Sequence, residues 1–145
     1  MPELITKLKE QIGDNGTILT WNMSYEKKCN DTMADLYPEH KQFLDNVNER
    51  INDLMIPFSK MWFVDKDFFG SASIKNVLPV LVPELNYKEL AVSDGLLARR
   101  TWTQTILHGK NQDQKEQILS DLSAYCTLDT FAMVRILQVL RQEVD

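Results

Sequence analysis

A tyrosine and an aspartate near the C-terminus are spaced to act together. In the segment Y-C-T-L-D-T, Tyr125 precedes Asp129 by four residues, so in a helix both side chains lie on one face. Asp129 falls on an apolar helical stripe, where a carboxylate must be paired, hydrogen-bonded or metal-bound to offset its lost hydration. Two interpretations stay open: a metal-binding carboxylate, or a capped or ion-paired aspartate beside a core tyrosine. The pattern alone favours the structural one.

A second group of polar side chains follows a β-branched segment near the N-terminus. In W-N-M-S-Y-E, Asn22 ends a predicted strand, Ser24 is the predicted N-cap of a helix, and Glu26 lies in its first turn. Binding sites in α/β proteins gather at the carboxyl ends of strands, which favours a functional Glu26. The alternative is structural, because a glutamate in a first turn also stabilises the helix dipole.

Hydrophobic periodicity predicts the elements that must position these residues. A short buried strand is expected over 16–22, and most of the rest of the chain reads as helices joined by turns and a loop that precedes residue 74. The expected helices cover residues 3–13, 24–37, 39–51, a short stretch near 74, 93–107 and 113–143, the last with a break near 120–123. Asp53 and Asp94 are predicted to cap helices. The expected fold class is a helix-rich α/β protein with few strands and about six helices.

Composition limits the classes of function. The net charge is −5, with 21 acidic against 16 basic residues, which argues against a protein that holds nucleic acid through a cationic face. It does not exclude a nuclease, because metal ions held by carboxylates can bridge to phosphate. No apolar run is long enough for a membrane helix. Cys29 and Cys126 are expected to be reduced thiols in a cytoplasmic protein.

The two polar segments together resemble motifs of known nucleases. The strand followed by N-x-x-[FY]-[DE], here Asn22, Tyr25 and Glu26, resembles the second motif of the 3′–5′ exonucleases of the ribonuclease H-like superfamily. Tyr125 and Asp129 resemble the third motif of these enzymes in its tyrosine-type (DEDD) form. The order and spacing of the two motifs support each other.

The chain resembles more closely an uncharacterised bacterial family of unknown function with a predicted relationship to nucleases. Members carry N-x-S-[FY]-E, R-x-x-D-L (here Arg50, Asp53 and Leu54), and a terminal Y-C-x-x-D-T. They also carry G-S-x-S-[IL]-K-x-V-L-P, which residues 70–79 match over ten positions. This resemblance covers nearly the whole chain and implies a truncated ribonuclease H-like exonuclease fold.

The resemblance implies roles for individual residues. Carboxylates on separate elements of such enzymes hold two metal ions about 4 Å apart. By this likeness Glu26 and Asp129 would bind Mg²⁺ or Mn²⁺, and Tyr125 would orient the attacking water. Substrate would be bound by a second set of residues, namely Asn22, Ser73 and Lys75. For Ser73 and Lys75 a helix cap and a solvated lysine are equally good interpretations.

The superfamily's first motif, D-x-E, has no counterpart in the sequence. The expectation is therefore a single nuclease-like domain over residues 1–145, either the C-terminal portion of a larger protein or a degenerate short relative. By itself it is expected to bind Mg²⁺ or Mn²⁺ weakly and to cleave nucleic acid slowly or not at all. The exposed edge of the strand at 16–22 would favour self-association or pairing with the missing N-terminal region. The rival interpretation is a non-catalytic helical protein-interaction module.

Overall fold

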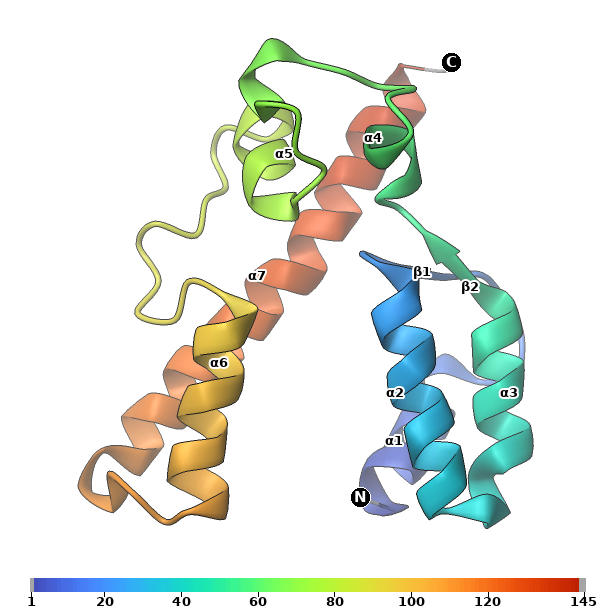
Figure 1. Cartoon of the computed structure of the whole chain (residues 1–145), viewed down its shortest axis with the longest axis vertical. Coiled ribbons are helices and arrows are strands. Elements are labelled where there is room, and N and C mark those ends of the chain that lie inside the picture. The colour runs from blue at the N-terminus through green and yellow to red at the C-terminus, as the bar shows by residue number, and fades with distance from the viewer. Residues whose placement is uncertain (1, 144–145) are drawn as a thin grey trace. The chain divides into compact units, whose positions relative to one another are not determined.

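The computed structural model describes residues 2–143 and divides the chain into two compact units, residues 1–63 and 64–145 (Figure 1). The described residues form a helix-rich α/β structure with seven helices, which confirms the predicted class and exceeds the expected six. The helices are α1 (Pro2–Ile12), α2 (Met23–Leu36), α3 (Lys41–Arg50), α4 (Ile56–Ser59), α5 (Ile74–Leu81), α6 (Gly95–Trp102) and α7 (Lys115–Gln142). The strands are β1 (Ile18–Thr20) and β2 (Ile51–Asp53). The expectation of one domain stays a prediction.

In the first unit, two short parallel strands are joined by a helical hairpin. β1 and β2 pair in the register Ile18↔Ile51, Leu19↔Asn52 and Thr20↔Asp53. A parallel pair needs a crossover connection, and α2 and α3 supply it by packing side by side (Figure 1). A single 3₁₀ turn, η1 (Pro38–His40), reverses the chain between them, where Pro38 ends the helical hydrogen bonding of α2.

The core of the first unit lies between α1, α2, α3 and β2. α1 contributes the fully buried Ile5, with Leu8 and Ile12 partly buried on the same face. The remaining buried members come from the hairpin and the second strand: Ala34, Phe43, Leu44, Val47 and Ile51. Within α3, Val47 follows Phe43 by four residues and Leu44 by three, which is the periodicity of a helix with one buried face.

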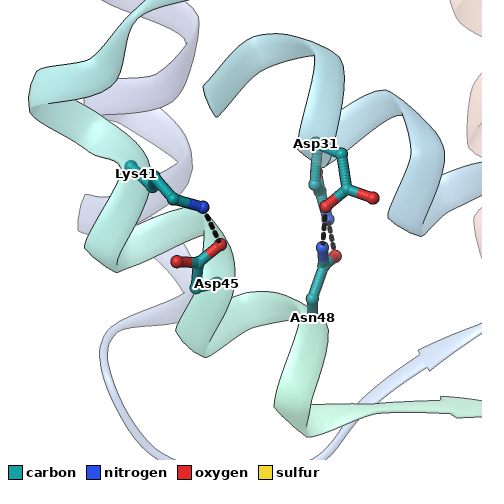
Figure 2. Close-up of polar contacts among 5 residues, drawn as sticks. Asp31, Lys41, Asp45 and Asn48 are labelled. Carbon is teal, nitrogen blue, oxygen red and sulfur yellow. Dashed lines mark hydrogen bonds and ion pairs between the residues drawn. The ribbon is translucent and has the colours of Figure 1, made fainter. Parts of the chain in front are cut away.

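A polar contact joins α2 to α3 beside this core (Figure 2). Asn48 of α3 donates from Nδ2 to Asp31 Oδ1 and accepts at Oδ1 from Asn30 Nδ2, both at 2.8 Å. Asn30 is buried, so its amide needs this partner. The face of α2 that meets the core therefore contains Asn30 and Ala34. Two large apolar or aromatic side chains of the same helix, Tyr25 and Leu36, are exposed instead.

The second unit is built on α7, a helix of 28 residues that is about 42 Å long. α5 and α6 both pack against it (Figure 1). The buried residues of the second unit come from α5, α7, the turns and the segment between α5 and α6; they are Phe68, Val77, Leu78, Val82, Tyr87, Val92, Thr105, Leu122, Tyr125, Ala132 and Ile136.

Three boundaries differ from the sequence-based expectations for physical reasons. The strand predicted over 16–22 is only half-buried and covers 18–20, because Gly16 (φ 91°) and Asn22 (φ 73°) hold left-handed turns on either side. α2 begins at Met23, so Ser24 is inside the helix and is not its N-cap. The break expected near 120–123 is absent from α7, where Ser120 and Ser123 face solvent and interrupt no packing.

Shorter turns complete the described chain. η2 (Lys66–Phe68) and η4 (Gln112–Gln114) are 3₁₀ turns, and η3 (Thr103–Leu107) is a π-helical turn that follows α6 directly. The helix predicted over 93–107 is thus an α-helix to Trp102 and a wider turn beyond it. In the described part of the chain, no helix is long and apolar enough to span a membrane.

Candidate functional site

In the first unit, a carboxylate from β2 caps the helix that follows β1. Asp53 accepts the backbone N–H groups of Asn22 and Met23 at 3.0 and 2.9 Å, and that of Met55 at 3.0 Å. The first N–H groups of a helix lack partners within it, and a negative charge there is favoured by the helix dipole. The predicted capping role of Asp53 is confirmed. The helix that it caps is α2, 30 residues away in the sequence.

The rest of the R-x-x-D-L segment holds the same strand junction together. The Arg50 guanidinium donates to the carbonyls of Gly13, Asn15 and Gly16, at 2.7, 2.7 and 3.2 Å respectively, and so fixes the turn that precedes β1. The buried Leu54 donates its N–H to Thr20 O at 2.9 Å and extends the strand pair. Each residue of this motif has a structural role in positioning the start of α2.

Glu26 lies in the first turn of α2, after the capped N–H groups. Its side chain is half-buried, and burial raises the pKa of its carboxyl above the ordinary value. Asn22, also a predicted site residue, is exposed and has its backbone in the left-handed region at the N-cap position. Asn22 and Glu26 thus lie at the same end of α2, where the Asp53 carboxylate accepts the backbone N–H of Asn22.

In the second unit, Asp129 is bound by a tyrosine that the sequence did not single out. The Tyr87 hydroxyl donates to Asp129 Oδ1 at 2.5 Å, a short distance typical of a hydrogen bond to a charged oxygen. Tyr87 is 6% exposed and lies in the irregular segment between α5 and α6. That segment has no hydrophobic periodicity, and 42 residues separate the two partners, so no sequence signal marks the pair.

Tyr125 lies one helical turn before Asp129, against both Tyr87 and the start of α6. It is 8% exposed, and the centroid of its ring lies 6.0 Å from the centroid of the Tyr87 ring. A Cβ atom on Gly95 would stand 3.5 Å from the Tyr125 hydroxyl, which places that hydroxyl beside the first residue of α6. Asp94 caps α6 by accepting Leu97 N–H at 2.7 Å, which confirms the predicted cap.

Burial and negative charge keep both tyrosines protonated. Burial is the larger cause that raises the pKa of the Tyr87 hydroxyl, and its hydrogen bond to Asp129 raises it further. Burial also raises the pKa of Tyr125, followed by the charge of Asp129. At neutral pH these phenols are therefore hydrogen-bond donors and not bases. A carboxylate offers about four lone-pair directions, so Tyr87 leaves part of Asp129 available to another partner.

Ser73 and Lys75 lie at the start of α5. Ser73 is the N-cap residue with an extended backbone, yet its side chain makes no capping hydrogen bond. Its N–H is turned toward the Ser71 hydroxyl at 3.2 Å. Both Ser73 and Lys75 are exposed, and Lys75 projects from the first turn of α5. Their assigned role in substrate binding stays a prediction.

The predicted site residues fall into separate groups. Asn22 and Glu26 belong to the first unit, whereas Tyr125, Asp129, Ser73 and Lys75 belong to the second. Within residues 2–143, no three His, Cys, Asp or Glu side chains converge as a metal site would require. The described side chains of either unit therefore do not fit a complete two-metal centre.

Comparison with known proteins places the chain in a family. The family model described as a domain of unknown function (DUF2779) matches residues 1–73, just over half of the 145 residues. The chain belongs to the DUF2779 family. The match covers the first unit with its R-x-x-D-L junction and reaches the N-cap of α5 in the second. Tyr125 and Asp129 lie beyond it.

One curated relative of this DUF2779 chain is an uncharacterized protein, UU173, of Ureaplasma parvum serovar 3. The two are 25% identical over 143 residues, which cover 88% of this chain and 21% of the relative. The chain thus spans about a fifth of the length of the relative that it matches. No solved structure matches the chain.

Proposed function

We propose that this chain contributes part of a metal-dependent 3′–5′ exonuclease-like site that acts on nucleic acid, and that it does not cleave nucleic acid by itself. The observation that carries the proposal is the Asp129 carboxylate, half-buried one turn after Tyr125 and hydrogen-bonded by Tyr87. Support also comes from the resemblance of Asn22, Tyr25 and Glu26 to a second exonuclease motif. The fold of the full site would be a ribonuclease H-like exonuclease fold.

In this proposal the chain's own residues hold charge and orient water. Asp129 and Glu26 would be ligands of Mg²⁺ or Mn²⁺, which in such enzymes activate water and stabilise a leaving oxygen. Tyr125 stays protonated, so it would donate a hydrogen bond to the attacking water or to a phosphate oxygen. Ser73, Lys75 and Asn22 would contact the nucleic acid. The remaining carboxylates would come from outside this chain.

A titration with Mn²⁺ tests the metal-binding part of the proposal. The whole chain is expected to bind Mn²⁺ weakly, and Asp129→Asn and Glu26→Gln should each weaken this binding several-fold. Asp35→Asn, a change on the exposed surface of α2, is the matched control and should leave it unaltered. If binding is undetectable, or equal in all four proteins, the assignment of Glu26 and Asp129 as ligands is wrong.

A cleavage assay tests the incompleteness of the site. End-labelled single-stranded DNA and RNA incubated with the chain and Mn²⁺ should remain intact. Metal-dependent shortening from the 3′ end that Asp129→Ala abolishes would show instead that the chain is a complete nuclease.

The second candidate, a non-catalytic protein-interaction module, is favoured by a different observation. On the side of α7 opposite the core, apolar side chains face solvent, among them Phe131 (45% exposed) and Val134 (47% exposed). Under this alternative, Tyr87, Tyr125 and Asp129 only stabilise the packing of α7. Substituting Asp129 would then lower stability and leave Mn²⁺ binding unchanged.

A further inference from the structure

The outer side of α7 carries a continuous stripe that is separate from the tyrosine–aspartate cluster. We define the outer stripe by six of the exposed residues on the face opposite the buried Leu122, Ala132 and Ile136: Ser120, Ser123, Ala124, Thr127, Phe131 and Val134. They recur every three or four residues, as neighbours on one helix face do. A shallow groove runs along this stripe between the side chains of Ser123, Thr127 and Phe131.

The side chains of the outer stripe increase in size from its N-terminal to its C-terminal end. Its N-terminal half contains only small side chains, such as Ser120 and Ser123, and its C-terminal half contains the large Phe131 and Val134. Small residues let two helices approach closely, and large residues need such gaps to fill. A stripe with gaps at one end and bulky side chains at the other fits a second copy of itself in the antiparallel direction.

Charges at the two ends of the stripe match the same arrangement. A two-fold axis at Thr127 places Phe131 opposite Ser123 and Val134 opposite Ser120, because each pair is equally far from Thr127. The same axis brings Asp113, in the η4 turn that directly precedes α7, level with Arg141 in the last turn of α7, because each lies 14 residues from Thr127. Both are exposed. Two-fold symmetry forms each of these pairs twice, as an isologous interface requires.

We propose that the chain forms an antiparallel homodimer through the outer stripe of α7, with the two-fold axis at Thr127 and Asp113–Arg141 ion pairs at both ends. This inference does not depend on the nuclease-like proposal, and it names the partner that the interaction-module alternative leaves open. Size complementarity supplies the close packing, and the end charges set the direction and register.

Sedimentation velocity over a concentration series tests the interface. The chain should sediment as a dimer at high concentration, and Phe131→Glu should make it a monomer while its circular dichroism is unchanged. Leu96→Glu is the control, since Leu96 is also apolar and is more exposed than Phe131 but lies on α6, and it should leave the dimer intact. A monomeric wild-type chain, or a dimer that survives Phe131→Glu, would overturn the proposal.

Disulfide trapping tests the register even if Phe131→Glu fails to fold. With Cys29 and Cys126 replaced by serine, Thr127→Cys should form a cross-linked dimer on oxidation, because the two copies meet at the axis. Ser120→Cys should not, since the antiparallel register separates its two copies by roughly 21 Å along the helices. Equal cross-linking of both variants, or none of Thr127→Cys, would contradict the arrangement.

A charge reversal gives a third, independent measurement. Asp113→Arg and Arg141→Asp should each raise the dimer dissociation constant several-fold, and the double variant should restore it. Dissociation constants that the reversals leave unchanged, or that the double variant does not restore, would show that the two ends do not meet.

Discussion

At the scale of single residues, the Tyr87–Asp129 hydrogen bond ties the irregular segment between α5 and α6 to α7. Tyr87→Phe removes only the hydroxyl and leaves the buried ring in place. The free energy of unfolding should fall by about 1–2 kcal/mol, because a half-buried carboxylate loses a short hydrogen bond. Urea denaturation measures this. Tyr25→Phe, at an exposed tyrosine, is the control and should have no effect; a loss of the same size there would count against the assigned role of the bond.

Glu26 gives a prediction whose sign depends on pH. Burial raises the pKa of its carboxyl above 4.5, so the folded state holds the proton more tightly than the unfolded state does. Proton binding by Glu26 therefore stabilises the fold fully below about pH 4.5, and this stabilisation is lost as pH rises through the folded-state pKa. Glu26→Gln should therefore match the wild type near pH 4 and be more stable at pH 7. The gain should be less than about 1 kcal/mol, since solvent screens a half-exposed carboxylate.

Urea midpoints of both proteins, measured between pH 4 and 8, decide the matter. A variant that is less stable than the wild type at pH 7 would mean that the interaction of Glu26 with the helix dipole outweighs its burial. If added Mn²⁺ stabilises the wild type at pH 7 and not Glu26→Gln, the nuclease-like proposal gains support.

At the scale of elements, one carboxylate links the end of β2 to the start of α2. Asp53→Ala removes the acceptor of three backbone N–H groups and should lower the free energy of unfolding of the first unit by about 2–3 kcal/mol. Asp35→Ala, on the exposed face of α2, should change it by less than about 0.5 kcal/mol. Chemical denaturation compares the two. Similar losses in both variants would mean that Asp53 does not anchor α2.

The elements show which parts of the structure a sequence can specify. Helical periodicity located α1, α3 and α7, because their apolar stripes repeat every three to four residues, and the local cap Asp94 was found by its spacing from α6. Contacts across long separations were not predictable in this way. The partner of Asp129 is Tyr87, in the irregular segment between α5 and α6. The side chain that accepts the first N–H groups of α2 is Asp53, which lies on β2. The local sequence pattern therefore pointed to Ser24 as the cap of α2, whereas the distant Asp53 carboxylate fills that role.

For the candidate site too, the sequence predicts where a residue lies within its own helix but not which distant residues it meets. The side-by-side placement of Tyr125 and Asp129 follows from four-residue spacing on a helix, and the structure adds that both face the buried side of α7. The location of Glu26 in the first turn of α2 likewise follows from local sequence. Glu26 belongs to the first unit and Asp129 to the second, and no local pattern relates two residues so far apart in the sequence.

At the scale of the whole molecule, the division into two compact units predicts where proteases cut first. The connection between them contains exposed lysines on both sides, Lys60 after α4 and Lys66 in η2. Short elements and exposed side chains, including Met61 and Trp62, mark this stretch as one that opens without unfolding a long helix. Brief trypsin treatment should therefore cleave after Lys60 or Lys66, before it cleaves within α3 or α7.

Mass spectrometry of the first fragments identifies the cut. Replacing both lysines with glutamine should slow the appearance of these fragments at least several-fold, whereas replacing Lys7 and Lys28, exposed on α1 and α2, should leave the rate unchanged. An initial cut inside α3 would show that the first unit opens more readily than the connection. The order of cutting thus reports whether stability is distributed by unit, because a helix must unfold locally before a protease can bind its backbone.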